Sequence, residues 1–440
     1  MIQYMRIARS LCGMVLSVTI AGSMACAGEP VFPLKVSANR RYLVDRNGRP
    51  FLVHGDTAWS LISGLSKAEA ERYLEDRRRK GFNAVIVNLI EQKFKGPVNR
   101  EGEPPFTTPG DFARPNQKYF AHADWVLRCA AAKGTLVLLA PLYLGYQGGD
   151  EGWYQEALAN GPEKCREYGR FLGRRYGDFA NLLWMMGGDR NPEKAWAATD
   201  ALAGGIKEYA RDHLFTAHAA PEFSAVDQYS AGGWLDLNTT YTYRIVHKML
   251  MRDYNRKPVL PFVLIESTYE GEHNASAVQI RRQAYWALLS GAAGQFLGNR
   301  PIWLFDPGWE AALDSPGSRE LMHLRSLFSS RPWHELLPDR EHRIVVSGLG
   351  EFNGLDYLAA ARTADRRVVM AYLPAARTFS VEMSEIAGPR ARAWWFNPRN
   401  GTTRSGGVFP AQGRRDFRPP EEGDWVLILE DAGLPARLAR

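Results

Sequence analysis

The chain of 440 residues is 45% hydrophobic and 23% charged, which excludes disordered, collagen-like and coiled-coil proteins. Its 55 lysines and arginines only slightly outnumber its 48 aspartates and glutamates, and they are dispersed apart from short clusters such as Arg77–Lys80. Nucleic-acid binding is therefore not indicated. The length fits two or three domains of about 150 residues, or one β/α barrel of about 250 residues with a small additional module.

Residues 1–27 have the pattern of a secretory signal peptide: two arginines, an apolar run and a small-residue end. No later stretch is apolar enough to span a bilayer, so we expect a secreted or periplasmic protein without a transmembrane segment. Cys26 leaves a second interpretation open, in which the chain is cut before this cysteine and acylated there. Ser23, however, suits such a lipoprotein signal poorly.

Eight short apolar runs of strand length follow, with segments of helical period among them. The runs lie at 51–54, 84–88, 135–140, 182–186, 215–217, 235–239, 259–265 and 295–297. The helical segments lie at 66–81, 118–133, 162–176, 192–212, 244–254, 275–290 and 318–329. In the first helix, Ser66 and Glu69 form a capping box and Gly81 is the stop signal. The stretch 221–233 is typical of a loop rather than a helix.

This alternation predicts a (β/α)8 TIM barrel over residues 28–340. A doubly wound sheet would need a glycine-rich nucleotide turn after its first strand, and the sequence has no GxGxxG or GxxxxGK motif. Before the barrel, 42–44 and 50–52 flank the turn sequence Asp45–Gly48. They predict a β-hairpin that closes the barrel floor.

From residue 343 onward the apolar runs alternate with turns alone, which predicts an antiparallel β-sandwich domain over 343–440. The predicted strands lie at 345–346, 357–361, 368–372, 379–383, 391–396 and 425–429. Trp394, Trp395 and Trp425 are better explained by a packed core and a domain interface than by an exposed ligand platform. We therefore expect this domain to be structural.

After the signal peptide the chain keeps two cysteines, Cys129 and Cys165, each on the apolar stripe of a predicted helix. Both are expected to face inward. Two buried thiols and a disulfide between neighbouring helices both remain open, since an exported protein meets an oxidising compartment. Neither cysteine is expected to be catalytic because no CxxC motif occurs.

The reactive groups of a β/α barrel gather where its strands end. The residues that close the predicted strands are rich in polar and aromatic side chains: His54, Asp56, Trp59, Asn88, Tyr143, Asp189, His218, Tyr241, Tyr243, Glu266, Asn299 and Trp303. Apolar runs deliver Asp189 and Glu266 to the rim from strands four and seven, which lie across a barrel from each other. Two opposed carboxyls over a pocket are what retaining glycoside hydrolysis requires.

The other strand-end residues suit a carbohydrate substrate, because sugar rings stack on Trp and Tyr while His, Asn and Asp bind hydroxyls. Each has a structural alternative. Asp189 could cap the helix that follows Pro192, and Asp56 the helix after strand one. The histidines could be hydrogen-bonded supports, and Trp59 and Trp303 could serve packing alone.

The sequence contains no motif typical of a metal site or of a serine nucleophile. His334–Pro338 begins like a zinc-protease motif, but Pro338 stands where the second histidine would be. The nine histidines show no ligand spacing, and GxSxG is absent. We therefore predict no metal and no cofactor.

Four strand-end motifs resemble the apiosidase-like barrel of glycoside hydrolase family 140: His54–Trp59, Gly187–Pro192, Glu266–Gly271 and Gly298–Trp303. The tail resembles the module named "putative collagen-binding domain of a collagenase", through the segments 359–362, 371–374, 394–398 and 424–427. The resemblance implies that Asp189 is the general acid/base, that Glu266 is the nucleophile, and that the sugar removed is apiose from pectin side chains. The segments 219–221 and 239–243 depart from the family pattern. Collagen binding is not supported by these residues alone.

We expect an exported, exo-acting retaining glycosidase whose two carboxyl groups lie about 5 to 5.5 Å apart. Long segments after strands two and three, 91–116 and 145–161, would wall the cleft into a pocket and favour exo action. One alternative is a barrel glycosidase that cuts within a polymer. Another is a non-catalytic carbohydrate-binding or matrix-binding protein, against which the presence of both carboxylates argues.

Overall fold

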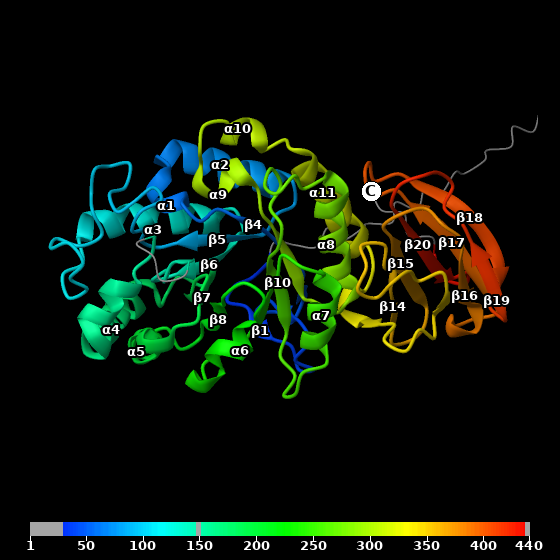
Figure 1. The fold of residues 1–440 in the computed structure, drawn as a ribbon, viewed down its shortest axis with the longest axis horizontal. Helices are drawn as coiled ribbons and strands as arrows, with labels where there is room; N and C mark the ends of the chain where they lie inside the picture. The colour runs from blue at the N-terminus through cyan, green and yellow to red at the C-terminus, as the bar shows by residue number, and fades with distance from the viewer. Residues whose placement is uncertain (1–29, 147–150, 436–440) are drawn as a thin grey trace, which may run out of the picture.

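The computed structural model describes residues 30–146 and 151–435. Figure 1 shows a β/α barrel that carries a smaller all-β domain on one side. The predicted signal peptide, 1–27, and Cys26 lie outside the described residues. Within the described ranges, no helix combines the length and the apolar character that crossing a membrane requires.

The barrel is built from eight parallel strands, as predicted. These are β4 (Val53–Thr57), β5 (Ala84–Asn88), β6 (Leu136–Ala140), β7 (Leu182–Gly187), β8 (Leu214–His218), β9 (Asn238–Tyr241), β10 (Phe262–Glu266) and β11 (Gly294–Leu297). Their order is β8-β7-β6-β5-β4-β11-β10-β9, so the first and last strands of the barrel pair with each other. Almost every strand residue is buried, as expected for a parallel sheet covered by helices.

The barrel closes between β8 and β9 through side chains. The hydroxyl of Thr216 donates to the carbonyl of Leu237 at 2.7 Å, and that of Thr239 donates to Ala217 at 2.6 Å. The backbone amide of Leu237 also reaches the carbonyl of Phe215 at 3.2 Å. These bonds satisfy polar groups that would otherwise form an open sheet edge.

The helices that surround the barrel are α1 (Leu61–Gly64), α2 (Lys67–Arg79), α3 (Gln117–Ala132), α4 (Tyr154–Tyr176), α5 (Trp196–Lys207), α6 (Ala225–Tyr229), α7 (Val246–Tyr254), α8 (Ala277–Leu289), α9 (Arg300–Leu304), α10 (Trp309–Ala312) and α11 (Pro316–Ser329). The capping box of Ser66 and Glu69 is present. Helix α4 begins before its predicted start at residue 162, because a kink at Gly161, with φ of 68°, joins a preceding helical segment to it.

The stretch 221–233, predicted as a loop, contains α6. Ser224 and Asp227 form a capping box at the start of this helix. The expectation of an unstructured loop was therefore wrong, and the reason is visible in the sequence: the serine and the acidic residue three positions later are the signature of a helix start.

A small antiparallel sheet closes the end of the barrel opposite the strand carboxyl ends. Its strands are β1 (Lys35–Val36), β2 (Leu43–Val44) and β3 (Pro50–Phe51), and the predicted hairpin turn joins the last two. Asp45 stabilises the turn by accepting hydrogen bonds from the backbone amides of Asn47 and Arg49. Leu43 and Phe51 pack into the same apolar cluster as the barrel interior, so the hairpin is part of the core.

The C-terminal domain is the predicted β-sandwich. One sheet contains, in spatial order, β12 (Leu336–Pro338), β14 (Ala359–Thr363), β15 (Val368–Leu373), β20 (Trp425–Asp431), β17 (Arg390–Phe396) and β18 (Thr403–Pro410). The other contains β13 (Val345–Ser347), β16 (Phe379–Glu382) and β19 (Arg414–Phe417). β12, β18 and β19 were not predicted. β12 lies before residue 343, within the range predicted for the barrel, but pairs with β14. β18 and β19 are largely exposed and carry arginines and glycines instead of an apolar run.

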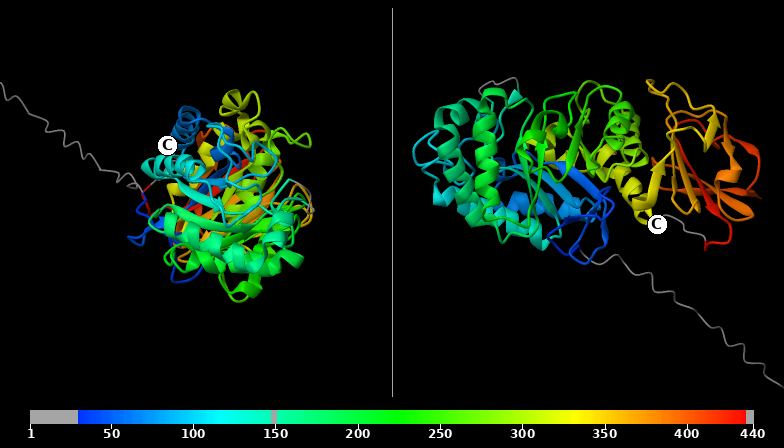
Figure 2. Two further views of the ribbon diagram at one scale, coloured as in Figure 1. Left: turned by 90° about the vertical axis from the view of Figure 1, so that its left-hand side faces the viewer. Right: turned by 90° about the horizontal axis from the view of Figure 1, so that it is seen from below.

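The larger sheet packs against α8 and α11 of the barrel (Figures 1 and 2). At this interface Arg281 of α8 makes a two-pronged ion pair with Asp424, with both N···O distances 2.7 Å. Tyr372 also donates to Asp424 at 3.0 Å, and its ring stacks on Tyr285 with centroids 4.6 Å apart. The sandwich is thus joined to the barrel by buried charges and rings.

Cys129 and Cys165 are both free thiols, so the disulfide alternative was wrong. Cys165 is fully buried, and this burial raises the pKa of its thiol to about 12. Cys129 is only partly buried beside the same apolar cluster. Two unreactive thiols in the helix layer is the outcome that the apolar stripes indicated.

Candidate active site

A cavity of about 700 Å³ lies over the carboxyl ends of the barrel strands. It brings together eight of the predicted residues: Trp59, Asn88, Tyr143, Asp189, Tyr241, Tyr243, Glu266 and Trp303. A ninth, His218, lies fully buried beneath the two carboxylates and contacts both. The strand-end principle therefore located this cavity from the sequence.

Glu266 is the last residue of β10 and is delivered by the buried run Phe262–Glu266. Its Oε1 accepts a hydrogen bond from the hydroxyl of Tyr243 at 2.7 Å. Its Oε2 lies 3.0 Å from Nε2 of His218. Only 6% of Glu266 is exposed, so two hydrogen-bond partners hold the carboxylate in one orientation.

Asp189 follows the end of β7 across a pair of glycines. Gly187 and Gly188 have φ of 83° and 126°, which only glycine adopts readily. A Cβ on Gly188 would lie 2.2 Å from the ring of Tyr143, so the glycine permits this close approach. The hydroxyl of Tyr143 then donates to Oδ2 of Asp189 at 2.6 Å, while Oδ1 is buried without a hydrogen-bond partner in the described structure.

The two carboxylates and the imidazole form a tight cluster. An oxygen of Asp189, an oxygen of Glu266 and a ring nitrogen of His218 all lie within 4.8 Å of one another. Burial, and next the charge of Glu266, raise the pKa of Asp189 to about 6, against the opposing effect of His218. Asp189 can therefore hold a proton in mildly acidic solution.

His218 is polarised by both carboxylates. Burial acts to lower the pKa of His218, but the hydrogen bond to Glu266 and the negative charges of Asp189 and Glu266 together raise it above its ordinary value. Its other nitrogen, Nδ1, lies 3.2 Å from the carbonyl of Ala219. An imidazolium can donate to both Glu266 and this carbonyl at once, so the cluster favours the charged form.

Asp189, His218 and Glu266 could also hold a metal ion, since each offers one ligand atom to the cluster. Nε2 of His218 and Oε2 of Glu266 already bond to each other in this arrangement. The prediction that no metal is required stays a prediction.

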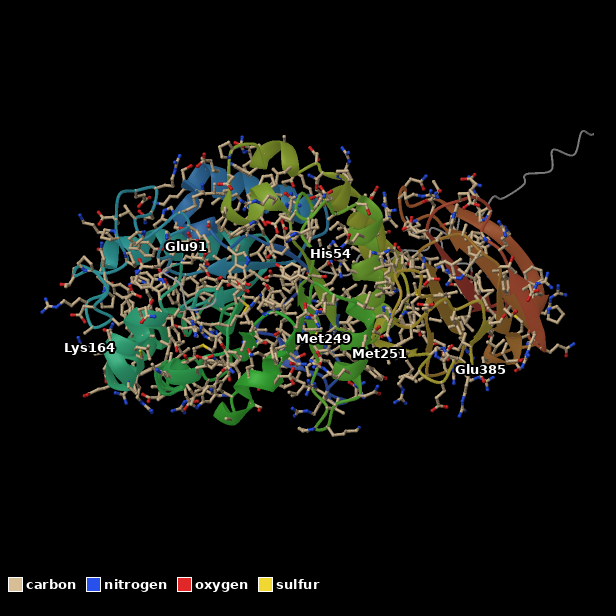
Figure 3. All side chains as sticks on the ribbon, viewed as in Figure 1. His54, Glu91, Lys164, Met249, Met251 and Glu385 are labelled. Carbon is tan, nitrogen blue, oxygen red and sulfur yellow. The ribbon has the colours of Figure 1, made fainter. Side chains whose placement is uncertain are left out.

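Three predicted residues, His54, Asp56 and Asn299, do not line the cavity; the amide of Asn299 is buried and donates to Glu270 and Ser315. The run 51–54 predicts the first strand, but β4 covers Val53–Thr57, and its inward face carries Val53. His54 and Asp56 consequently face the helix layer. The ring of His54, labelled in Figure 3, stacks on Phe82.

Asp56 is completely buried in an ion pair instead. It accepts a hydrogen bond from the hydroxyl of Tyr73 at 2.8 Å, and its Oδ2 lies 3.3 Å from Nε of Arg77. Both partners belong to α2, so Asp56 ties the first strand to the first long helix. We correct the expectation that His54 and Asp56 bind substrate: the structure places both in supporting positions.

Contacts exclude the helix-cap alternative for Asp189 and describe the surroundings of the two tryptophans. Asp189 does not cap the next helical segment, whose N-cap position is Pro192, with no side-chain cap. The indole of Trp59 donates to Tyr269 at 3.2 Å, and that of Trp303 donates to Glu272 at 3.3 Å, while both line the cavity.

Sequence reasoning missed several residues that line the cavity: Phe94, Tyr146, Glu151, Pro221, Thr268, Tyr269, Glu272, His273 and Gln279. They come from the segments after β5, β6, β8 and β10 and from α8. Four of them lie within seven residues of Glu266, so proximity in sequence to a strand-end carboxylate was the available signal. The others follow from loop conformation, which the strand pattern does not specify.

Residues 37–335 match the model of the family described as "Apiosidase-like, catalytic domain". The chain belongs to the apiosidase-like family. Residues 338–430 of this apiosidase-like protein match a second model, described as "Putative collagen-binding domain of a collagenase". No match is found among curated proteins.

Solved structures agree with the family. One titled "Glycoside hydrolase" is 27% identical, with a TM-score of 0.81 over 92% of this chain and 98% of its own. A glycoside hydrolase family 5 structure from Bacteroides vulgatus is 24% identical, with a TM-score of 0.81 over 91% and 94%, and shows the shared fold. The apiosidase-like protein is thus a glycoside hydrolase on a TIM barrel, and a carbohydrate substrate fits it.

Proposed function

We propose that the enzyme is a retaining glycosidase in which Glu266 is the nucleophile and Asp189 the general acid/base. One observation carries the proposal: an oxygen of each carboxylate lies within 4.8 Å of the other in a single cavity. Retaining enzymes separate their carboxyl groups by about 5 to 5.5 Å, whereas inverting enzymes leave about 6.5 to 9.5 Å for a water molecule. The narrow spacing supports direct attack by Glu266.

In the first step the carboxylate of Glu266 attacks the anomeric carbon while Asp189 donates its proton to the departing glycosidic oxygen. The C–O bond to the leaving group breaks as the glycosyl ester forms. In the second step Asp189 takes a proton from water, which attacks the same carbon and releases Glu266. The hydrogen bonds from Tyr243 and His218 orient the nucleophile for both steps.

The cavity walls support exo action. Phe94 follows β5 in a segment with no helix before α3, and Tyr146 and Glu151 follow β6. Trp303 completes the wall from α9. The long segment predicted after strand three, 145–161, is shorter than expected, since α4 already begins at Tyr154. A site enclosed on these sides suits a chain end better than the middle of a polymer.

The proposal includes export to the periplasm or the medium, which rests on the signal-peptide pattern of residues 1–27. The family name suggests apiose as the sugar that is released. Trp59, Tyr241 and Trp303 line the cavity with aromatic side chains, on which a sugar ring can stack, and Asn88 lines it with an amide side chain.

A panel of aryl glycosides tests this assignment, with apiosides, arabinofuranosides and common pyranosides as substrates. For the accepted sugar, NMR of the first product should show the anomeric configuration of the substrate, because two successive displacements restore it. An inverted product would exclude Glu266 as nucleophile. Binding of glycosides without hydrolysis of any would favour the non-catalytic alternative.

The pH dependence of kcat/KM should reflect the protonation of Asp189. The pKa of this group is about 6, and the general acid must be protonated, so kcat/KM should fall as the pH rises through about 6. In His218→Asn the positive charge that holds this pKa down is lost, so the basic limb should move to higher pH. The measurement is the pH profile of kcat/KM on a substrate with a poor leaving group.

His273→Asn is the matched control for this profile. His273 lines the same cavity, but its ring contacts Tyr243 rather than either carboxylate. The basic limb of the His273→Asn profile should coincide with that of the unmodified enzyme. A His218→Asn profile that keeps its limb in place, or shifts it to lower pH, would contradict the role given to the imidazolium.

A further inference from the structure

Glu91 is a buried acidic residue beside the active-site cavity that the proposed mechanism does not use. It follows the end of β5 by three positions, and Figure 3 labels it near β5 and α1. Only 2% of Glu91 is exposed, and it forms no ion pair within the residues that the structure describes. A buried carboxyl group without a cation needs hydrogen-bond donors or a proton of its own.

One oxygen of Glu91 closes a turn that contains Phe94. Oε2 of Glu91 accepts a hydrogen bond from the backbone amide of Lys95 at 2.9 Å. The turn is tight, since a Cβ on Gly96 would lie 2.4 Å from the carbonyl oxygen of Glu91. Phe94 lines the active-site cavity, and the centroid of its ring lies 5.3 Å from that of Trp303. Oε2 therefore has a structural role, which a test of the other oxygen has to leave intact.

The other oxygen, Oε1, belongs to a group of four buried oxygens that have no hydrogen-bond partner in the described structure. The group contains Oε1 of Glu91, Oδ1 of Asn88 and the hydroxyls of Ser60 and Ser63. None of these four residues is more than 2% exposed. The side chains of both serines and of Asn88 lie close enough to Glu91 to act on its carboxyl group as hydrogen-bond partners. The four groups thus form one buried polar cluster.

The amide oxygen of Asn88 needs a donor, and the proton of Glu91 can supply it. The hydroxyls of Ser60 and Ser63 can donate to Glu91, but an ionised carboxylate and Oδ1 of Asn88 are both acceptors and repel each other. A proton on Oε1 converts this repulsion into a hydrogen bond. Burial raises the pKa of Glu91 above its ordinary value, although the hydrogen-bonding groups around it, Ser60 foremost, act to lower it.

The titratable neighbours of Glu91 are engaged elsewhere. The amine of Lys95 pairs with Asp306 at 2.8 Å. The hydroxyl of Tyr119, on α3, donates to the carbonyl of Leu89 at 2.9 Å. The groups that β5 and α1 contribute to the cluster are an amide and hydroxyls, which are uncharged. The charged form of Glu91 therefore gains little from its surroundings, and the neutral form is favoured.

Asn88 connects this cluster with the active-site cavity. It ends β5 and lines the cavity, and its backbone amide donates to the carbonyl of Trp59 at 2.8 Å. With Oδ1 buried in the cluster, the NH2 group is what its side chain offers to a substrate. Resting on the proposed function, we infer that Glu91 is a positioning residue: it holds a proton on Oε1, donates a hydrogen bond to Oδ1 of Asn88, and so directs the NH2 group of Asn88 to an oxygen of the bound sugar.

Infrared difference spectroscopy of the full chain tests the proton on Glu91 without any substrate. At about pH 5, above the ordinary pKa of a glutamate, the spectrum of the unmodified protein minus that of Glu91→Gln should contain the C=O stretching band of a protonated carboxyl group. Glu101→Gln is the matched control. Glu101 lies in the same segment after β5, but a hydrogen bond from Lys67 lowers the pKa of Glu101, so this variant should keep the band. Absence of the band from the Glu91→Gln difference would overturn the inference.

A double-mutant cycle on kcat/KM tests whether Glu91 acts through Asn88, with the aryl glycoside that the panel identifies as substrate. Asn88→Ala should lower kcat/KM roughly threefold to tenfold by removing the donor. Glu91→Leu should lower it by at least as much. In the Asn88→Ala background the further loss from Glu91→Leu should be at least about threefold smaller, since only the turn around Phe94 is left to disturb. Equal losses in both backgrounds would mean a purely structural role and overturn the inference.

Glu91→Gln keeps the cycle interpretable if Glu91→Leu does not fold. Its amide can donate to Oδ1 of Asn88 and accept from the amide of Lys95, so kcat/KM should stay within about twofold of the unmodified enzyme. A loss of more than about tenfold would show that a carboxylate charge is needed, against the inference. The infrared result does not depend on Asp189 or Glu266. If no glycoside is hydrolysed, the spectrum still decides on the proton, and if the band is absent, aryl glycosides still report on the catalytic pair.

Discussion

Replacing Glu266 with alanine should abolish turnover of every glycoside, whereas replacing Asp189 should not. Without Glu266 no glycosyl ester can form, and the loss of a covalent nucleophile costs at least about 10⁴-fold in kcat. Asp189→Ala removes only proton transfer, which contributes about 10²- to 10⁴-fold on a poor leaving group. The two variants are compared on an aryl glycoside of the accepted sugar.

The difference between Asp189→Ala and Glu266→Ala should be larger on a substrate with an activated leaving group. Dinitrophenolate needs little protonation, so Asp189→Ala should form the glycosyl ester of Glu266 quickly and then hydrolyse it slowly. An initial burst of phenolate should be followed by a slow steady state. Azide needs no general base and should speed that steady state by forming a glycosyl azide. Glu266→Ala should show no burst at all.

A cavity-lining carboxylate provides the control. Glu151 lines the same cavity but has no hydrogen bond to Asp189 or Glu266 in the described structure. Glu151→Ala should keep turnover and show no response to azide. If Asp189→Ala and Glu266→Ala lose activity equally and azide rescues neither, the assigned roles are wrong. Full activity in Glu266→Ala would exclude a retaining mechanism through this residue.

The sequence predicted the two carboxylates of this site, because their positions depend on short apolar runs of strand length. Glu266 ends an uninterrupted apolar run, and Asp189 follows one. All strands of a parallel barrel run in the same direction, so their carboxyl ends meet at one face of the barrel. That end is where the structure places both side chains. The contacts that tune them, from Tyr143 and Tyr243, depend on loop conformation, which the run does not encode.

The misplaced residues have an equally specific cause. Residues 51–54 form one apolar run, but Phe51 belongs to the floor hairpin and Val53 begins β4. Phe51 and Val53 lie in the apolar cluster of the barrel interior, whereas Leu52 lies in the cluster outside it. Because side chains alternate along a strand, His54 and Asp56 share the outward face of Leu52. The prediction rested on their nearness to the strand end and did not use this alternation.

Two buried carboxylates of the sandwich, Asp424 and Glu430, pair with arginines of the barrel, Arg281 and Arg331, and Asp424 makes the two-pronged pair. Its two oxygens bond to the guanidinium of Arg281, and one also accepts from Tyr372. Asp424 and Arg281 are 1% and 4% exposed, so solvent cannot replace a lost partner. Arg281 keeps a second carboxylate, Glu320, whose Oε2 lies 2.5 Å from Nη1.

Asp424→Ala should therefore lower the free energy of unfolding by about 3 kcal/mol, the low end of the cost of breaking a buried ion pair, since Arg281 keeps Glu320 as a carboxylate partner. Urea unfolding followed by tryptophan fluorescence measures the loss. Glu421→Ala is the matched control: Glu421 pairs with Arg404, both side chains are about half exposed, and such a pair contributes about 0 to 1 kcal/mol. If Asp424→Ala lost no more than Glu421→Ala, the Arg281–Asp424 pair would not be what holds the sandwich on the barrel, and the Arg331–Glu430 pair and the stacked rings of Tyr285 and Tyr372 would have to hold the interface.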